Sequence, residues 1–329
     1  MRYIRARQVA VAAGTLMTLA GSLAPAASAQ PAAHASKPSM VAPYVDTSLA
    51  GEYPALYHAI TSQHLKDITA GFVIAQGGSC VPMWGGGSAV SNDPGVTTMI
   101  KTARRDGAAV IVSFGGANGS ELATTCHNTA KLTAAYRSVV KELHVTHLDF
   151  DIEGDGLAIT SANKRRFAAI HALEAGNHKL AVSLTVPVTP TGLDSLGTSL
   201  LREAKHAKAK INLLNVMAMD YGGGKHEMGK TAIRVATDAL RQLRHYFPHS
   251  TYRNIGITPM IGHNDVYSEV FTTADAHRLV RFARTHHVGR LAFWSLNRDQ
   301  RCTTPQTTAQ FDCSGIAQGS LAFTHIFAR

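Results

Sequence analysis

Residues 147–154 read HLDFDIEG, and this stretch decides between the folds open to the chain. Successive side chains of a β-strand point to opposite faces, so Asp149, Asp151 and Glu153 share one face. The two apolar residues between them face the other way and suit packing against helices. The alternative is a strand at the exposed edge of a sheet, with its acids facing water. A strand of a closed barrel has no exposed edge, so a barrel leaves no place for this alternative. The pattern therefore favours a barrel strand whose acids point inward.

The rest of the chain repeats the alternation of a short apolar, β-rich run with a helical stretch. Helical spacing of apolar residues predicts helices at about 231–246 and 274–284. The strands are expected at about 40–45, 68–75, 109–114, 147–152, 180–187, 211–219, 254–260 and 290–295. Eight such strands predict an α/β fold, a (β/α)8 TIM barrel in one domain. A doubly wound open sheet is the competing fold, but its glycine-rich turn after the first strand is missing.

The first 39 residues are expected to lie outside the barrel. Residues 1–29 carry three early arginines, an apolar stretch and an Ala-Ser-Ala site ending at Ala29, the pattern of a secretory signal peptide. Glycines and a proline interrupt the apolar run, which argues against a membrane anchor. Residues 30–39 form a short Ala/Pro linker, and residues 40–329 form the catalytic barrel. We therefore expect export, with cleavage near Ala29.

Charge and cysteine content restrict the possible partners. The net charge is +10, but the basic residues are scattered and no nucleic-acid motif is present, so a solvated basic surface is favoured over nucleic-acid binding. The four cysteines permit three disulfide pairings, of which sequence order favours Cys80 with Cys126 and Cys302 with Cys313. No cofactor and no metal are expected, because neither the cysteines nor the histidines have metal-ligand spacing.

The stacked acids point to catalysis. Buried carboxylates are costly unless they are protonated, hydrogen-bonded or functional, and their mutual repulsion raises the proton affinity of at least one. A carboxylic acid that keeps its proton near neutral pH is what general acid catalysis requires. A divalent metal site is the main rival, but such sites usually draw ligands from turns and not from one straight strand.

The chain resembles family 18 of the glycoside hydrolases, the chitinases. Asp149, Asp151 and Glu153 match the last three acids of the family's D-x-x-D-x-D-x-E motif. Three further landmarks follow the family's order on other expected strands: Ser113-Phe114-Gly115-Gly116 for S-x-G-G, Trp294 for the floor tryptophan, and Tyr44 for a barrel aromatic. The resemblance extends over most of the chain after the linker.

Two departures from the family pattern are evident. Thr146 stands where the motif has its first acid. The family's M-x-Y-D on the sixth strand appears as MAMDY: Met217 and Asp220 align, but Met219 holds the tyrosine position and Tyr221 follows the acid. A bulge at the strand end could bring Tyr221 into the site.

The resemblance implies a substrate-assisted, retaining mechanism. Glu153 would protonate the glycosidic oxygen, and the 2-acetamido oxygen of the substrate would attack the anomeric carbon. Asp151 would orient the acetamido N–H, while Asp149 beneath it would hold Asp151 and share a proton. Tyr221 or Asp220 would contact the acetamido group from the opposite side. The implied substrate is chitin or a chito-oligosaccharide.

The remaining candidates concern substrate binding. Trp294 would form the floor of the sugar site, and Trp84 either stacks a sugar at an outer subsite or packs on the surface. Gly115 and Gly116 serve backbone packing or close substrate approach. The full predicted substrate-binding set is Trp294, Met217, Tyr44, Gly115, Gly116, Trp84 and Asn118.

The interval 260–290 leaves little room for the α+β domain that many family members insert there. We therefore expect an open groove and internal, endo-type cleavage. Two rival functions stay open, an endo-β-N-acetylglucosaminidase acting on N-glycans and a non-catalytic, chitin-binding lectin-like protein. A monomer without stable membrane insertion or nucleic-acid binding is the expected state.

Overall fold

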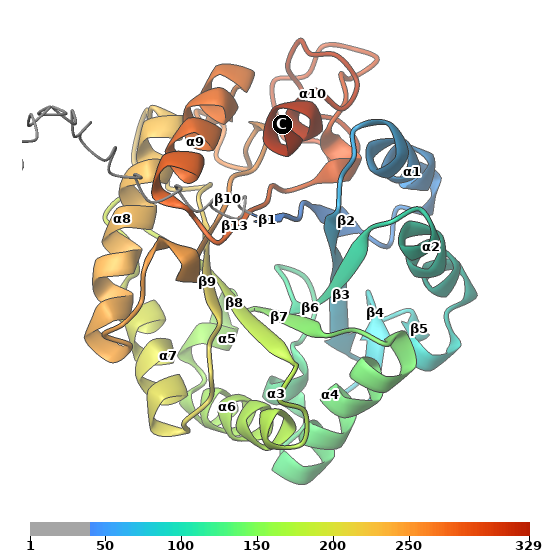
Figure 1. The fold of residues 1–329 in the computed structure, drawn as a ribbon, viewed down its shortest axis with the longest axis vertical. Coiled ribbons are helices and arrows are strands. Elements are labelled where there is room, and N and C mark those ends of the chain that lie inside the picture. Colours follow the sequence, from blue (N-terminus) through green and yellow to red (C-terminus); the bar gives the residue numbers. More distant parts are fainter. Residues whose placement is uncertain (1–39) are drawn as a thin grey trace, which may run out of the picture. The chain divides into compact units, whose positions relative to one another are not determined.

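The computed structural model describes residues 40–329, which form a closed parallel barrel surrounded by helices (Figure 1). The predicted signal peptide and linker lie outside the described residues. The strands of the barrel are β1 (Met40–Val41), β2 (Tyr44–Asp46), β3 (Asp67–Ala75), β6 (Ala109–Gly115), β7 (His147–Asp151), β8 (Ala181–Pro187), β9 (Leu213–Met217), β10 (Ile255–Thr258) and β13 (Arg290–Leu291). The (β/α)8 prediction is confirmed.

The first barrel strand is divided, and its two halves close the barrel. β1 pairs in parallel with β13, at Met40 with Arg290, whereas β2 pairs in parallel with β3, at Tyr44 with Thr69. Pro43 lies between the halves and cannot donate a ladder hydrogen bond, although its carbonyl accepts one from the Thr69 amide at 2.9 Å. The two ends of the sheet therefore meet through one short segment.

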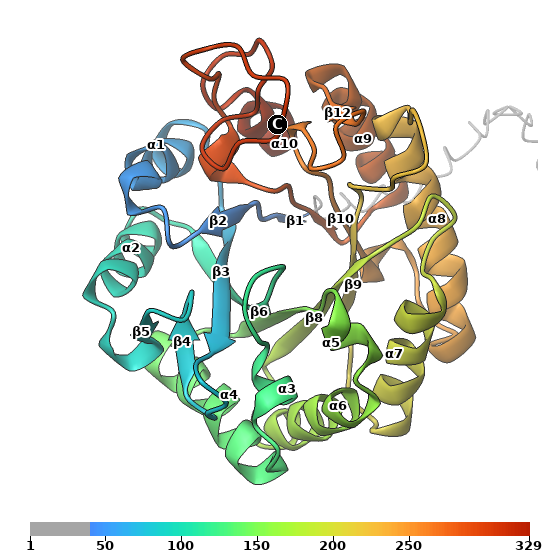
Figure 2. The same ribbon diagram turned by 180° about the vertical axis from the view of Figure 1, so that it is seen from behind.

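Helices cover the outside of the barrel in both views (Figures 1 and 2). The two predicted helices fall within α8 and α9, and α9 starts at a capping box in which Thr272 and Asp275 bond each other's backbone. The α-helices are α1 (Tyr53–Ser62), α2 (Pro94–Arg105), α3 (Leu122–Thr125), α4 (Thr129–Leu143), α5 (Asp155–Ala158), α6 (Thr160–Ala175), α7 (Ser195–His206), α8 (Met228–Tyr246), α9 (Thr273–His286) and α10 (Ala322–Ala328). The 3-10 turns are η1 (Ala50–Glu52), η2 (Val90–Asn92), η3 (Tyr252–Asn254) and η4 (Leu296–Arg298).

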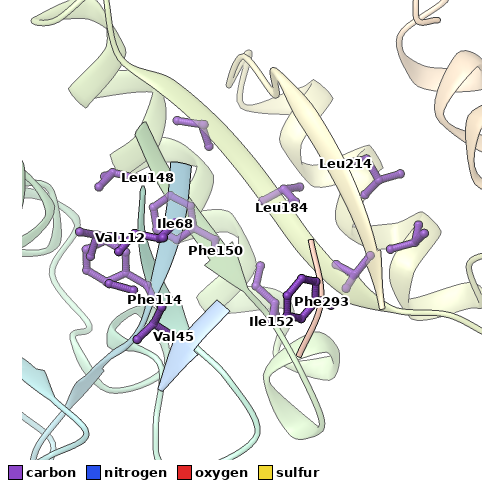
Figure 3. Packing of buried hydrophobic residues seen from close by; sticks show 14 of the residues in the cluster. Val45, Ile68, Val112, Phe114, Leu148, Phe150, Ile152, Leu184, Leu214 and Phe293 are labelled. Atoms are coloured by element: carbon purple, nitrogen blue, oxygen red, sulfur yellow. The ribbon is translucent and has the colours of Figure 1, made fainter. Parts of the chain in front are cut away.

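The apolar residues of β7 pack outward, as their alternation predicted. Leu148, Phe150 and Ile152 are buried between the barrel and its helices (Figure 3). The Phe150 ring stacks on Phe114 of β6 at a centroid distance of 5.3 Å, and Tyr136 of α4 meets both rings edge-on at 5.0 Å. The opposite face of β7 is thereby turned into the barrel.

Two small antiparallel additions escaped prediction because their strands are only two or three residues long. β4 (Pro82–Trp84) and β5 (Ser88–Ala89) extend the sheet beside β3, and β11 (Gly262–His263) pairs with β12 (Val270–Phe271). Trp84 of β4 is only 4% exposed and packs in the core, so this structure meets neither of its two expected roles, stacking of a sugar at an outer subsite or packing on the surface. The segment between β10 and β13 holds only the β11–β12 hairpin and α9, which confirms that the chain has no α+β insertion there.

The favoured disulfide pairing is present, with Cys80 bonded to Cys126 and Cys302 bonded to Cys313. The first bond joins the loop after β3 to the end of α3, and the second closes a loop after η4. In residues 40–329, no helix has the length and apolar character needed to cross a bilayer.

We predict that the two disulfides contribute unequally to stability. A cross-link stabilises mainly by restricting the unfolded chain, and the restriction grows with the length of the closed loop. The Cys80–Cys126 bond spans 46 residues and the Cys302–Cys313 bond spans 11. Replacing the first pair by serine should cost about 4 kcal/mol of unfolding free energy and replacing the second about 3 kcal/mol. Urea unfolding of the two double variants checks the order, and a reversed order would contradict it.

Candidate active site

A cavity of about 470 Å³ opens over the carboxyl ends of the barrel strands. Every barrel position contributes to its wall, as the fold requires of a catalytic site. Lining residues from the strands in order include Tyr44, Phe72, Asn118, Asp151, Glu153, Thr185, Met217, Asp220, Thr258 and Trp294. Among the predicted site residues, Asp149, Tyr221, Gly115, Gly116 and Trp84 do not line this cavity.

Glu153 follows β7 directly and lines the cavity while largely shielded from solvent. Burial, and then the negative charges of Asp220 and Asp265, raise the pKa of Glu153 to about 7. Its carboxyl group therefore keeps a proton up to neutral pH, which is the state that a general acid needs.

Asp151 is 4% exposed and lies two residues before Glu153 on the same face of the strand. Burial, and then the charges of Glu153 and Asp149, raise the pKa of Asp151 well above its ordinary value. Its Oδ1 atom has no hydrogen-bond partner among the residues that the structure describes. An unpaired buried carboxyl oxygen at a cavity wall is available to a donor on a ligand.

Gly115 and Gly116 shape the backbone beside Asp151. Gly115 has a φ of +100°, and a Cβ on it would lie 2.0 Å from the Asp151 carbonyl oxygen. That same oxygen accepts a hydrogen bond from the Gly116 amide at 3.0 Å, and a Cβ on Gly116 would lie 2.7 Å from the Phe72 ring. The glycines thus allow the end of β6 to hold the end of β7, the structural one of their two predicted roles.

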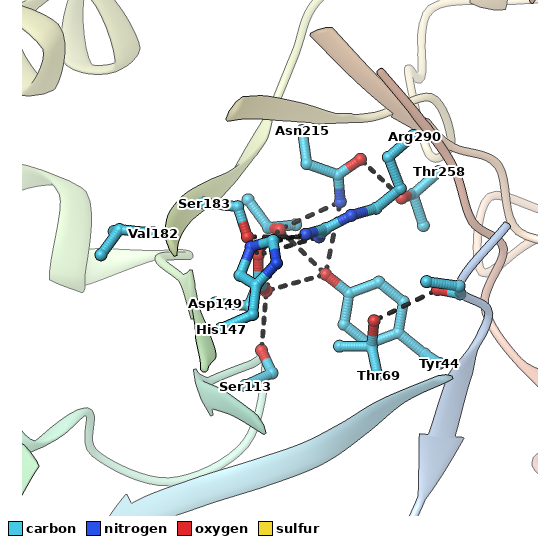
Figure 4. A network of polar contacts seen from close by, with 12 residues as sticks. Tyr44, Thr69, Ser113, His147, Asp149, Val182, Ser183, Asn215, Thr258 and Arg290 are labelled. Carbon is cyan, nitrogen blue, oxygen red and sulfur yellow. Dashed lines mark hydrogen bonds and ion pairs between the residues drawn. The ribbon is translucent and has the colours of Figure 1, made fainter. Parts of the chain in front are cut away.

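Asp149 lies below the cavity and is fully buried in a polar network inside the barrel (Figure 4). Hydroxyl groups surround its carboxylate: Oδ2 accepts from Tyr44 at 2.9 Å and from Ser113 at 2.8 Å. Thr185 donates to it at 3.0 Å, and Ser183 donates to Oδ1. The expected hydrogen bond with Asp151 is absent from the described residues, because these four hydroxyls and an arginine occupy the oxygens of Asp149.

The arginine is Arg290 of β13, a residue that the sequence analysis missed. Its Nη1 atom lies 3.5 Å from Asp149 Oδ1, and both side chains have no exposure to solvent. Its Nη2 atom donates to His147 Nε2 at 2.8 Å, and burial followed by the charge of Arg290 lowers the pKa of His147 well below its usual value. His147 is therefore neutral and acts as a structural acceptor. In the sequence, the only sign of the pair formed by Arg290 and Asp149 is the single arginine at the start of the strand expected at about 290–295.

The end of β9 follows the sequence alignment only in part. Asp220 lines the cavity, has a φ of +50°, and accepts a hydrogen bond from the Val266 amide at 3.0 Å. Burial, and then the charges of Asp265 and Glu269, raise its pKa. Met219, in the family's tyrosine position, lines the cavity.

Tyr221 does not reach the cavity, so the expectation that it swings in to replace the tyrosine is not met in this structure. The left-handed backbone of Asp220 turns the chain, and the Tyr221 ring packs edge-on against His226 at 5.4 Å. Its amide donates to Glu269 at 3.1 Å.

Three aromatic rings form the floor of the cavity. Trp294 stacks on Phe72 at a centroid distance of 5.6 Å, and Tyr44 contacts both rings at about 6 Å. Trp294 was predicted to form this floor, whereas Phe72 was missed because nothing in the apolar run of β3 marks it. Such a surface suits the apolar face of a sugar ring.

Another cavity, of about 320 Å³, shares part of its lining with the first. Asp151 and Glu153 line both cavities, and Gly154, Asp155 and Ile159 belong to the second alone. The two carboxyl groups therefore lie between two spaces, each of which can receive part of a chain molecule.

Comparison with known proteins shows what this chain is similar to. No profile of a known protein family matches the chain. It is 32% identical over 305 residues to a probable bifunctional chitinase/lysozyme of Escherichia coli, covering 87% of this chain and 34% of that protein. It is 31% identical over 277 residues to endochitinase 11 of Metarhizium anisopliae, covering 78% of this chain and 52% of that protein. The chain thus spans about a third to a half of the length of these relatives.

Solved structures agree in fold. The catalytic domain of a hyperthermophilic chitinase from Pyrococcus furiosus superposes with a TM-score of 0.78 at 29% identity, covering 89% of this chain and 95% of that domain. A family 18 chitinase from Pseudoalteromonas aurantia shares the fold with a TM-score of 0.61 at 14% identity, covering 78% of this chain and 94% of its own. The chain shares the TIM-barrel fold of these chitinase catalytic domains. The chain is thus similar in sequence to chitinases and in fold to the catalytic domains of family 18 chitinases.

We predict that Arg290→Met destabilises the barrel because it leaves the Asp149 carboxylate buried without its counter-charge. Breaking a buried ion pair in this way costs about 3–5 kcal/mol. Adding Asp149→Asn to Arg290→Met should recover part of that loss, since the double variant no longer buries an unpaired charge. Urea unfolding of the two single variants and the double variant measures the coupling. Strictly additive losses would show that the pair does not act as a unit.

Proposed function

We propose that this chain hydrolyses the β-1,4 bonds between N-acetylglucosamine units of chitin, with Glu153 as acid and then base. The observation that carries the proposal is the pairing of a protonated Glu153 with a buried Asp151 whose Oδ1 atom is unpaired, on the wall of one cavity. The names of the relatives, which include chitinases from bacteria, a fungus and Pyrococcus, support chitin as the substrate.

In the first step, Glu153 gives its proton to the glycosidic oxygen as the bond from that oxygen to the anomeric carbon breaks. The acetamido carbonyl oxygen of the same sugar forms the new bond to the anomeric carbon, which yields an oxazolinium ion. In the second step, the Glu153 carboxylate takes a proton from water, and the water oxygen bonds to the anomeric carbon as the bond from that carbon to the acetamido oxygen breaks. Two inversions at one carbon give a product of retained, β configuration.

Asp151 and the aromatic floor assist these steps. The unpaired Oδ1 atom of Asp151 is free to accept a hydrogen bond from the acetamido N–H, which orients the attacking oxygen. Asp220 lies on the same cavity wall as Met219, and both can contact the acetamido group from the side opposite Asp151. Trp294 supports the sugar from below.

We propose internal cleavage, because Glu153 lines two cavities. The two cavities that share Glu153 and Asp151 can hold sugar units before and after the bond that is cut. The hairpin that replaces an inserted domain leaves the groove without an additional wall. We also propose that the protein acts outside the cytoplasm, where its two disulfides are stable.

The first test replaces Glu153 by glutamine. Parent protein should convert a chitin pentamer to shorter products that first appear as β-anomers, while Glu153→Gln should lose several orders of magnitude in kcat. Glu174→Gln, the same chemical change at the end of α6, is the control and should keep parental activity. Binding of the pentamer by parent without cleavage would overturn the proposal in favour of a lectin, and cleavage only of a high-mannose glycoprotein would favour an endo-β-N-acetylglucosaminidase.

The second test concerns pH. Glu153 acts as an acid, so kcat/KM should fall as pH rises through about 7, the pKa of its carboxyl group. Asp265→Asn removes one of the negative charges that raise this pKa, and the alkaline limb should therefore move to lower pH. Because Asp265 is exposed, the shift should shrink in high salt. Asp238→Asn on α8, with an equal change in net charge, should leave the limb in place, and an identical shift in both variants would contradict a local effect.

A further inference from the structure

One corner of the barrel top carries the two most exposed aromatic side chains in the described part of the chain. Tyr267 is 69% exposed and Phe311 is 66% exposed. The other large apolar side chains that are exposed in residues 40–329, Val81, Ile159 and Leu196, are aliphatic. Single exposed apolar residues are common on protein surfaces, so exposure alone assigns no role. The positions of the two rings carry the argument.

Tyr267 lies beside the active-site cavity. It belongs to the turn of the β11–β12 hairpin, two residues after Asp265, which lines the cavity. Two residues of extended chain span at most about 7 Å. The residue between them, Val266, donates its amide to Asp220 of the cavity wall at 3.0 Å. The turn that carries Tyr267 is thus tied directly to the catalytic cavity.

Phe311 is brought to the same corner by a buried arginine. Arg298 of η4 is 1% exposed, and its Nη2 atom donates to the His263 carbonyl of β11 at 2.6 Å. Its Nη1 atom donates to the carbonyl of Gln310, the neighbour of Phe311. One guanidinium group therefore joins the hairpin that carries Tyr267 to the loop that carries Phe311.

Both segments are fastened at further points. The His263 amide donates to the Ser314 carbonyl at 2.9 Å, and the Cys302–Cys313 disulfide closes the loop around Phe311. On the hairpin side, the fully buried Glu269 accepts hydrogen bonds from the amides of Tyr221 and Gly222. The two rings consequently stand on segments that are already ordered, and binding a ligand there costs little conformational entropy.

We propose that Tyr267 and Phe311 form an outer sugar-binding site, which holds N-acetylglucosamine units of a chitin chain that extends beyond the cavity. The inference rests on the proposed function and adds to it a preference for long chains. A flat aromatic side chain offers a large, rigid apolar surface with few rotatable bonds, which matches the apolar face of a pyranose ring. This outer site, called the rim below, adjoins the cavity through Asp265, so one chitin chain can occupy the rim and the cavity together.

The test compares a hexamer and a trimer of β-1,4-linked N-acetylglucosamine. Tyr267→Ala should lower kcat/KM for the hexamer about tenfold more than for the trimer, a factor that corresponds to about 1.4 kcal/mol. Phe311→Ala should act in the same direction, and Tyr267→Trp should restore the parental ratio. Leu196→Ala on the outer helix α7 removes an exposed apolar side chain away from the rim and is the control. Thermal unfolding of each variant confirms that it is folded.

A second measurement separates the rim from catalysis. In the Glu153→Gln background, calorimetry should show that Tyr267→Ala weakens binding of the hexamer about tenfold and binding of the trimer less. If Tyr267→Ala keeps the parental hexamer-to-trimer ratio in both assays, the proposed sugar-binding role of the rim is wrong, and the proposed function stands. If the parent cleaves neither oligomer, the proposed function is wrong. The ratio of hexamer to trimer binding measured by calorimetry then still tests whether the rim binds sugar. Absence of both hexamer cleavage by the parent and hexamer binding by Glu153→Gln overturns both proposals.

Discussion

The buried ion pair between Asp149 and Arg290 is the constraint on which the site depends. A carboxylate in the interior of a barrel would be strongly destabilising without a counter-charge and hydrogen bonds, and here it has both. The donors come from β2, β6, β8 and β13, so one residue of β7 draws strands from around the barrel toward its axis (Figure 4). The same network fixes the base of the strand that carries Asp151 and Glu153.

Compensation of charge decreases from the base of β7 to its top. Asp149 has an arginine and four hydroxyl donors, whereas Asp151 has an unpaired oxygen and Glu153 meets further acids in Asp220 and Asp265. Burial, and then the charges of neighbouring acids, raise the pKa of the upper two groups, which both line the cavity. The three carboxyl groups thus lie in different electrostatic surroundings.

Sequence alone predicted the elements whose signals are local. The eight strands, the inward face of Asp149 and the disulfide pairing follow from periodicity, alternation and order. It could not predict Arg290, because its partner lies across the barrel and about 140 residues away. Tyr221 was misjudged because the left-handed turn at Asp220 breaks strand alternation, and Trp84 because its strand is too short to recognise. Non-local contacts and short irregular segments account for these errors.

The divided first strand has a consequence for how the protein is made. Met40 pairs with Arg290, about 250 residues later, so a ribosome must synthesise most of the chain before the barrel can close. The counter-charge of Asp149 arrives at that same late moment, since it is Arg290 that supplies it. Folding dominated by such distant pairings is slow, and the nascent chain stays open for longer than one with local contacts.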